Sequence, residues 1–387
     1  MRLRGRDIVC VGFADWDTEL RTNQHHLMSR LARDNRVLFV ESLGLRRPGL
    51  SSRDLSRIVR RVVNGLKPPR AADGLHVLSP LVIPLHRYGF VRAVNRRLLP
   101  FLVRRAVRRL GMNAPILWAY VPQAEVLVES LRPSQIVYHC VDDMAAQKGI
   151  DGPSFRTAEA RFAASADLVF ASSAPLAERL AEVSDHVVAM TNVADTERFA
   201  GALENGPVDP AIAALPRPRI VFTGAIVRTK LNFELLVALA RARPDWSIAL
   251  VGPIGPGDPS TDVSALRREP NVHLLGKRRY EELPDVLRGA DAALIPYDIN
   301  ELTASIFPMK VYEYLAAGLP VATTPLPSLA GVEGIVTAAD AEATVAALEE
   351  LLQADGPEAR ADRSRLAESH SWENRLDEIA EALGAHG

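Results

Sequence analysis

A lysine and a glutamate lie three residues apart in the segment 305–325, which reads SIFPMKVYEYLAAGLPVATTP. Pro308 and Gly318 predict a short helix followed by a buried strand, because proline suits a first helical turn and glycine commonly ends a helix. Lys310 and Glu313 then share one helical face. A cation, a carboxylate and free N–H groups at a helix start suit a ligand with phosphates and a sugar diol. A solvated Lys–Glu pair on a packing helix has the same spacing.

This segment resembles the donor-site signature P-x-K-x-x-E-Y-L-A-x-G-x-P-V of glycosyltransferases with the GT-B architecture, particularly the large bacterial family 4. Its P-M-K-V-Y-E-Y form is also similar to the xanthan-type glucuronosyltransferase branch, which is inverting. The resemblance implies that Glu313 binds the ribose of a nucleotide. The family often has another glutamate where this chain has Ser305, so retention or inversion of the anomeric configuration stays open.

A second group of cations follows a predicted strand that ends at Gly224. Arg228 and Lys230 stand directly before a predicted helix start, where two cations and unpaired N–H groups make a diphosphate site. Alone, this loop could be an ordinary charged surface. Beside the segment 305–325 it resembles the family's glycine–Arg–Lys loop, which holds the pyrophosphate of the donor. Further candidates for donor contacts lie at strand ends and in loops of this half: Gly252, Gly276, Tyr297, Thr303 and Ser305.

Two carboxylates end the strand predicted for QIVYHCVDD, residues 135–143. Ligands of parallel sheets bind beyond the carboxyl ends of the strands, so Asp142 or Asp143, with His139 nearby, is a candidate general base for an acceptor hydroxyl. Adjacent residues point to opposite faces, so at most one aspartate has this role. A strand-end cap or a turn is the alternative interpretation.

The first strand, DIVCVGFA, leads through a polar loop into a helix and a second strand, RVLFVES. The same rule for parallel sheets makes the loop and the helix start candidates for acceptor binding. The residues concerned are Asp15, Trp16, Gln24 and His25. The alternative places the histidines on a helix surface. A dinucleotide pocket is not expected here, because the glycine fingerprint is missing.

Strands and helices alternate through both halves of the chain, which predicts an α/β protein. The resemblance implies two Rossmann-like doubly wound domains facing a cleft, the GT-B fold. We expect an N-terminal acceptor-binding domain over residues 1–200 and a linker rich in Ala, Pro and Gly over 201–218. A nucleotide-sugar-binding domain over 219–360 and a helix over 361–387 that crosses back to the first domain follow.

Charge is unevenly distributed along the chain. Residues 1–113 carry 23 Lys and Arg against 8 Asp and Glu, a net charge of +15, so the remainder carries −16. Within the segment 51–111, arginines border an apolar stripe at helical spacing, which is typical of a basic amphipathic segment on an anionic membrane. A purely solvated basic face is the alternative. Nucleic acid is disfavoured, because no helix-turn-helix, zinc-finger or RNP pattern accompanies the arginines.

The two cysteines, Cys10 and Cys140, lie in apolar runs and predict buried thiols in a reducing compartment, without disulfide or metal spacing. Neither a signal-peptide core nor an apolar run long enough to span a bilayer occurs. We therefore expect a cytoplasmic protein, peripheral on the inner face of the plasma membrane.

Together these features predict a glycosyltransferase that moves a sugar from a nucleotide-diphosphate sugar to a hydroxyl acceptor. The expected acceptor is a lipid-linked saccharide or glycolipid of surface polysaccharide assembly. No cofactor and no metal are expected, because cations and helix starts can neutralise the leaving diphosphate. The alternatives are a nucleotide-sugar epimerase of the same fold and a non-catalytic relative that binds sugar nucleotides or membranes. The sequence does not specify the base, the sugar, the acceptor or the oligomeric state.

Overall fold

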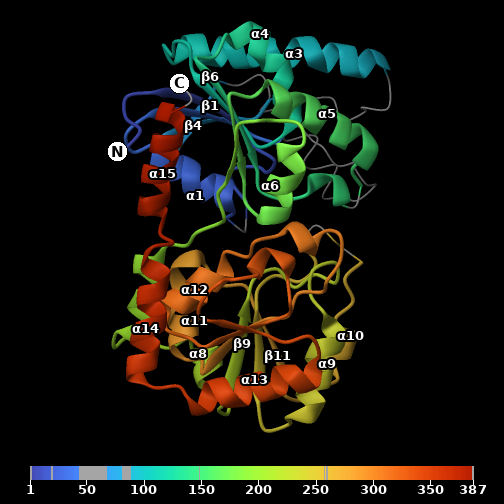
Figure 1. Cartoon of the computed structure of the whole chain (residues 1–387), viewed down its shortest axis with the longest axis vertical. Coiled ribbons are helices and arrows are strands. Elements are labelled where there is room, and N and C mark those ends of the chain that lie inside the picture. The colour runs from blue at the N-terminus through green and yellow to red at the C-terminus, as the bar shows by residue number, and fades with distance from the viewer. Residues whose placement is uncertain are drawn as a thin grey trace. The chain divides into compact units, whose positions relative to one another are not determined.

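The computed structural model describes residues 2–18, 21–42, 68–80, 89–147, 149–256, 258 and 260–385; in the helix that begins at Gly89, side chains are described from Asn95 onward. The chain forms two compact units, seen in Figure 1: Met1–Thr191 together with Leu376–Gly387, and Asn192–Arg375. In sequence order, the second unit is thus inserted between two parts of the first. The part of the predicted basic segment at 51–67 and 81–88 lies outside the described residues.

The first unit contains a sheet with the strand order β3-β4-β2-β1-β5-β6-β7-β8. Its neighbouring strands run parallel, except that β3 and β4 pair antiparallel. The order reverses between β1 and β5, which makes this the switch point of the sheet. The strands are β1 (Asp7–Val11), β2 (Arg36–Val40), β3 (Arg70–Ala72), β4 (Leu75–Leu78), β5 (Ile116–Ala119), β6 (Gln135–Cys140), β7 (Leu168–Ala171) and β8 (Val187–Ala189).

These strands form from short apolar runs, which a parallel sheet covered by helices buries on both faces. In β1, for example, Ile8, Val9 and Val11 have no exposed surface. Cys10 and Cys140 are free and buried, as the sequence predicts. The helices of this unit are α1 (Asn23–Leu31), α3 (Gly89–Arg109), α4 (Val128–Leu131), α5 (Gly152–Ser165) and α6 (Ala174–Ala181), and the last helix of the chain, α15 (Trp372–Ala385), contributes its final turns.

The second unit contains an all-parallel sheet in the order β11-β10-β9-β12-β13-β14. Numbered along the chain, this is the doubly wound order 3-2-1-4-5-6, with its switch point between β9 and β12. The strands are β9 (Arg219–Thr223), β10 (Ser247–Val251), β11 (Val272–Gly276), β12 (Ala292–Ile295), β13 (Val321–Thr323) and β14 (Ile335–Thr337). The α-helices are α7 (Thr196–Ala200), α8 (Pro210–Ala213), α9 (Phe233–Ala242), α10 (Ser264–Arg267), α11 (Leu283–Arg288), α12 (Lys310–Ala316), α13 (Ala341–Gln353) and α14 (Pro357–Glu368). The predicted α/β class is confirmed.

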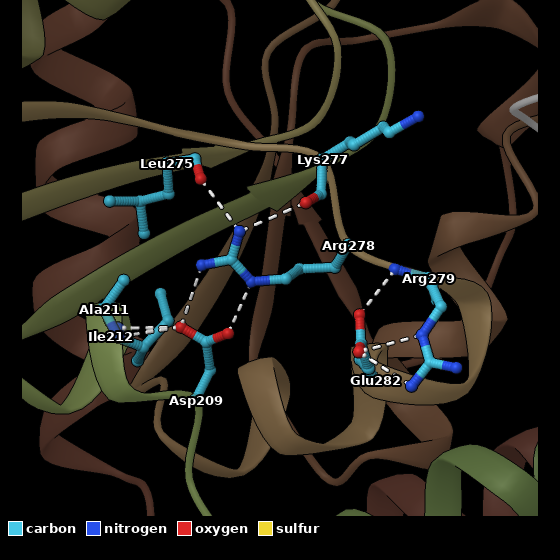
Figure 2. Close-up of polar contacts among 8 residues, drawn as sticks. All are labelled: Asp209, Ala211, Ile212, Leu275, Lys277, Arg278, Arg279 and Glu282. Carbon is cyan, nitrogen blue, oxygen red and sulfur yellow. Dashed lines mark hydrogen bonds and ion pairs between the residues drawn. The ribbon is translucent and has the colours of Figure 1, made fainter.

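Residues 201–218, expected as a linker, are instead part of the second unit. Asp209 begins the short helix α8, where its carboxylate accepts hydrogen bonds from the N–H groups of Ala211 and Ile212 at 2.9 and 3.2 Å. The same carboxylate pairs with Arg278, as Figure 2 shows, and Ile212 has no exposed surface. Residues 201–218 are therefore ordered and held by specific contacts, although they are rich in Ala, Pro and Gly.

Candidate functional site

At the switch point of the second sheet, the loop after β9 contacts the loop after β12. The N–H of Asp298 donates to the carbonyl oxygen of Lys230 at 2.8 Å. Leu231 and Tyr297 form an antiparallel bridge beside this bond. Ligands of open α/β sheets bind where the strand order reverses, beyond the carboxyl ends of the strands. The two loops that carry most of the predicted donor residues therefore form one edge of a candidate site.

Gly224 and Gly252 lie against each other where β9 and β10 end. A β-carbon on Gly252 would lie 2.6 Å from the carbonyl carbon of Gly224, which is closer than real β-carbons approach other atoms. A β-carbon on Gly224, whose φ is +142°, would lie 2.9 Å from Nζ of Lys310. Glycine is thus required for this close approach. The structure places Gly224, Gly252 and Lys310 together.

Lys310, the first residue of α12, extends its ammonium under this loop. Its Nζ lies 5.9 Å from the centre of the Phe222 ring. The side chain is half-buried, and removal from water lowers the pKa of Lys310, while the negative charge of Glu313 opposes that change. A partly desolvated cation at a helix start suits an anionic ligand.

Glu313 is 6% exposed and belongs to the same helix. Burial raises the pKa of Glu313; the Lys310 ammonium lowers it and the Asp195 carboxylate raises it further. Beside it, the Tyr314 hydroxyl accepts the N–H of Thr223 at 2.7 Å and so fixes α12 to the end of β9. Lys310 and Glu313 therefore share one face, as the sequence predicts, and are locked to the strand that carries Gly224.

Arg228 lies on the same loop but is directed elsewhere. Its guanidinium pairs with Glu234 at 2.6 Å and stacks 5.4 Å from the centre of the Phe233 ring. Both partners belong to the first turn of α9, which is capped by the Asn232 side chain. Lys230 thus lies where the loops after β9 and β12 meet, and Arg228 is held over the start of α9.

The remaining loop candidates hold the backbone in place. Thr303 is fully buried, and its hydroxyl donates to the carbonyl oxygen of Asp298 and accepts the N–H of Asn300. Tyr297 is 6% exposed, and its carbonyl accepts the Thr324 hydroxyl at 2.7 Å. Ser305 is half-exposed. Of these residues, Ser305 presents the most accessible side chain.

In the first unit, Asp143 lies directly beyond β6. Asp143 is 5% exposed, and its Oδ2 accepts a hydrogen bond from Arg156 of α5 at 2.5 Å. Its Oδ1 is buried without a hydrogen-bond partner among the described residues. Asp142 is half-exposed beside it. The burial of the two aspartates therefore differs, as expected for adjacent residues that point to opposite sides.

His139 is placed within the core. It is 2% exposed and stacks on Tyr120 with ring centres 4.9 Å apart. The rings of Trp118 and Phe170 lie at 5.8 and 5.6 Å. Its side chain thus packs among aromatic rings of β5, β7 and Tyr120 in the core of the first unit.

The expected acceptor residues near β1 are mostly buried. Gln24 has no exposed surface, and its Oε1 accepts the N–H of Phe13 at 3.0 Å. His25 also has none; Nδ1 accepts the N–H of Thr22 at 3.1 Å, and Nε2 donates to the carbonyl oxygen of Asp15 at 3.0 Å. These contacts define a neutral imidazole, and burial lowers the pKa of His25. The interpretation of the histidines as helix-surface positions is wrong.

Trp16 joins this buried group. It is 4% exposed, and its ring lies 4.9 Å from that of Phe39, while its Nε1 donates to Asp73 at 3.1 Å. Of the four expected acceptor residues, only Asp15 is partly exposed. Gln24, His25 and Trp16 therefore hold the loop after β1 against the sheet.

The helix α3 exposes a basic face. From Asn95 to its end, Leu99, Val103 and Ala106 are buried against the first core. The exposed residues are Arg96, Arg97, Phe101, Arg104, Arg105, Arg108 and Arg109. Phe101 is 62% exposed, so an aromatic ring stands among six arginines.

The described residues contain neither a membrane-spanning helix nor a metal-binding cluster. No helix among them is both long and apolar enough to cross a bilayer. In the same part of the chain, no three or more His, Cys, Asp or Glu side chains are grouped so that they could hold a metal ion.

The two doubly wound sheets, each with its own switch point, are two Rossmann-like domains. Solved structures with two such domains superpose on this chain. HepE of Anabaena in complex with UDP superposes with a TM-score of 0.67 at 13% identity, over 98% of this chain and 100% of HepE. Sucrose-phosphate synthase of Thermosynechococcus elongatus gives 0.68 at 16% identity, over 99% and 100%. The chain has the GT-B fold, with two Rossmann-like domains.

Sequence comparison finds similarity to one family of glycosyltransferases. Residues 217–354 match the model of glycosyl transferases group 1. TuaH of Bacillus subtilis (strain 168), described as a teichuronic acid biosynthesis glycosyltransferase, is 28% identical over 289 residues, which are 69% of this chain and 71% of TuaH. The predicted resemblance to group 1 glycosyltransferases and the predicted GT-B fold are confirmed.

The structure adds residues that the sequence did not single out for the site. Asp195 lies near enough to Glu313 to affect its pKa, and Thr223 binds the Tyr314 hydroxyl. Arg156 holds the buried Asp143 carboxylate. Asp195 was visible as part of the N-V-A-D segment at residues 192–195. Thr223 and Arg156 carry no local signal, because their partners are distant in the sequence.

Proposed function

We propose that this glycosyltransferase transfers a sugar from a nucleotide-diphosphate sugar to an acceptor hydroxyl. One observation carries the proposal: the Lys310 ammonium lies under the Gly224 loop, with the Glu313 carboxylate on the same helix, at the switch point of the second sheet. A cation beside closely packed glycine backbone receives a diphosphate, and a nearby carboxylate accepts hydrogen bonds from ribose hydroxyls.

The leaving group determines the roles of these residues. As the acceptor oxygen bonds to the anomeric carbon, the bond from that carbon to the diphosphate breaks and its electrons pass to the nucleotide. Lys310 and Lys230 would neutralise this charge, so that the reaction needs no metal. The UDP and UDP-glucose present in the HepE complexes support a nucleotide-sugar donor.

Asp143 is the candidate general base. Its Oδ2 is paired with Arg156, and its second oxygen lacks a hydrogen-bond partner in the described structure. That oxygen would take the proton of the acceptor hydroxyl. Because Oδ1 is buried, access to it requires movement of the segment after β6.

The proposed acceptor is a membrane-bound saccharide of surface polysaccharide assembly. TuaH is described as a teichuronic acid biosynthesis enzyme, which supports a polysaccharide product. The basic face of α3, with Phe101 exposed among arginines, suits anionic headgroups on the inner face of the plasma membrane.

A thermal-shift screen of nucleotide-diphosphate sugars tests the donor site. A donor at about one hundred times its Kd stabilises the folded protein by about 2.7 kcal/mol, which raises Tm by roughly 5 °C or more. We expect such a shift with UDP-glucose or another donor for the wild type, and its loss in Glu313→Ala. Glu342→Ala, on the exposed surface of α13, is the matched control. An equal shift in Glu313→Ala would remove this carboxylate from the site.

Sedimentation with vesicles tests the membrane proposal. Wild-type protein should sediment with vesicles that contain phosphatidylglycerol. With vesicles of pure phosphatidylcholine it should stay in the supernatant. Replacing Arg104 and Arg105 with Gln should weaken binding, at about 1 kcal/mol per removed charge. Replacing the exposed Arg267 and Arg268 with Gln removes the same charge elsewhere and should have no effect. Equal sedimentation of both double variants would contradict the role of α3.

A further inference from the structure

A hollow opens at the amino ends of β1 and β2 in the first unit. Its volume is about 420 Å³, within the range of about 300–1,000 Å³ that small-molecule sites have. Two chain segments line it, one directly before β1 and one in the turn between α1 and β2. We call it the amino-edge hollow, and its lining includes Gly5, Arg6, Arg33, Asp34, Asn35 and Arg36.

Asn35 joins the two segments that line the amino-edge hollow, and it is only 9% exposed. Its Oδ1 accepts the N–H of Arg6 at 3.0 Å. Its Nδ2 donates to the carbonyl oxygens of Leu3 and Leu31, both at 2.9 Å. The N–H of Arg36 also donates to the carbonyl oxygen of Arg6, at 3.0 Å. The backbone around the hollow is therefore held in place by the protein itself.

Two of the three arginines in the lining are left for a ligand. Arg36 is engaged twice, because its guanidinium pairs with Asp7 at 2.8 Å and its Nη1 donates to the carbonyl oxygen of Leu110 at 3.1 Å. Arg6 and Arg33 are exposed, and neither side chain has a hydrogen bond or an ion pair within the described part of the chain. Two guanidinium groups without carboxylate partners therefore line one hollow.

The acidic residue of the lining does not cancel these two charges. The carboxylate of Asp34 lies 4.0 Å from Nε of Arg4, which is outside the lining, and Asp7 pairs with Arg36. Access is also open, because Gly5 has φ of +66° and no atom would lie within 4 Å of an added β-carbon. The amino-edge hollow thus presents two positive charges to a ligand that enters from solvent.

The hollow lies away from the residues proposed for donor and acceptor. β1 and β2 run parallel from it, and the loop after β1 lies beyond their other ends. Five residues of strand separate the two ends, about 16 Å. Since ligands of parallel sheets react at the carboxyl ends, a ligand of the hollow is not a reacting group. The bond from Arg36 to Leu110 instead places the hollow at the end of α3, next to its basic face.

We propose that the amino-edge hollow binds a phosphate group, as a monoester or a diester, through the guanidinium groups of Arg6 and Arg33. Arginine presents a planar fork of donors that matches the oxygen atoms of phosphate, and such charge-assisted hydrogen bonds are strong. The phosphate belongs either to a lipid headgroup, which the neighbouring basic face of α3 would bring close, or to a soluble phosphorylated compound. This proposal does not depend on the proposed donor site.

Two binding assays separate the sources of the phosphate. Calorimetric titration with inorganic phosphate and with glycerol 3-phosphate tests the soluble source, and sedimentation with phosphatidylglycerol vesicles tests the lipid source. The parent protein for both is the full chain with Lys310→Met, which weakens binding of the probes at the proposed donor site. We expect Arg6→Gln and Arg33→Gln each to weaken binding about tenfold. Arg2→Gln is the control, because Arg2 is exposed on the same segment and does not line the hollow.

The pattern of losses decides the proposal. A loss with the soluble probes identifies a free phosphorylated compound, and a loss with vesicles identifies a lipid headgroup; each supports the phosphate site. The effect of Arg2→Gln should be clearly smaller, and thermal unfolding should show that all variants remain folded. Three results would overturn the proposal. They are no binding of any probe by the parent protein, unchanged affinity in both test variants, and equal weakening in Arg2→Gln, which indicates only a solvated basic surface.

Discussion

The contact between Gly252 and Gly224 makes Gly252→Ala the sharpest test of the proposed diphosphate site. The added β-carbon would lie 2.6 Å from the carbonyl carbon of Gly224 and still nearer its oxygen. Carbon atoms pack best at about 3.5 Å or more, so the two backbone segments must separate by about 1 Å. Because neither segment is a flexible side chain, the strain moves the Gly224 loop and the Lys310 ammonium beneath it.

We expect this displacement to lower the rate of sugar transfer about a hundredfold, since a 1 Å misplacement has that effect in a tight site. The rate of donor hydrolysis should fall by the same factor. Overpacking should also cost about 1–3 kcal/mol of stability. A turnover assay with a donor titration measures the effect on the site, and thermal unfolding measures the effect on stability. Gly201→Ala is the control, because an added β-carbon there meets no atom within 4 Å. Normal donor affinity and turnover in folded Gly252→Ala would refute the placement of the diphosphate at this loop.

Three further predictions concern charged or buried groups. Lys310→Met should weaken UDP binding by about 10–100-fold, the worth of a hydrogen bond to a charged group, and calorimetry showing unchanged affinity would contradict it. Asp143→Asn should bind donor normally yet transfer sugar about 100-fold or more slowly, measured by release of UDP with acceptor present; near-normal turnover would exclude Asp143 as base. Burial lowers the pKa of His25, so the folded state binds fewer protons than the unfolded state. Urea titrations should therefore show stability falling as pH drops below 6.5, and His25→Gln should reduce that dependence.

Much of the fold follows from local patterns. Apolar runs such as β9 and β10 are buried throughout, and their alternation with helices predicts two parallel sheets. The exception is α8, which has only four residues and no apolar periodicity. It is held by Asp209, whose partner Arg278 is 69 residues away. A pairing at that separation leaves no local trace, so the segment resembles a linker.

The candidate site divides in the same way. Lys310 and Glu313 are predictable because helical spacing alone places them on one face. Gln24 and His25 are not, because polar residues in a short helix resemble a solvent face. They are buried since their side chains bind the backbone of Phe13 and Asp15, and hydrogen bonds between a side chain and a distant backbone group follow no period.

The interrupted first unit has a consequence for synthesis. Its last segment begins at Leu376, and there Ile379 is fully buried and the carbonyl of Leu383 accepts a hydrogen bond from Gln135. While the chain is being translated, the first unit therefore lacks the part of its core that follows Leu376. The second unit can fold earlier, because its two ends meet where the N–H of Ala194 donates to the carbonyl oxygen of His370. The first unit can thus complete its fold only once Leu376 and the residues after it have been translated.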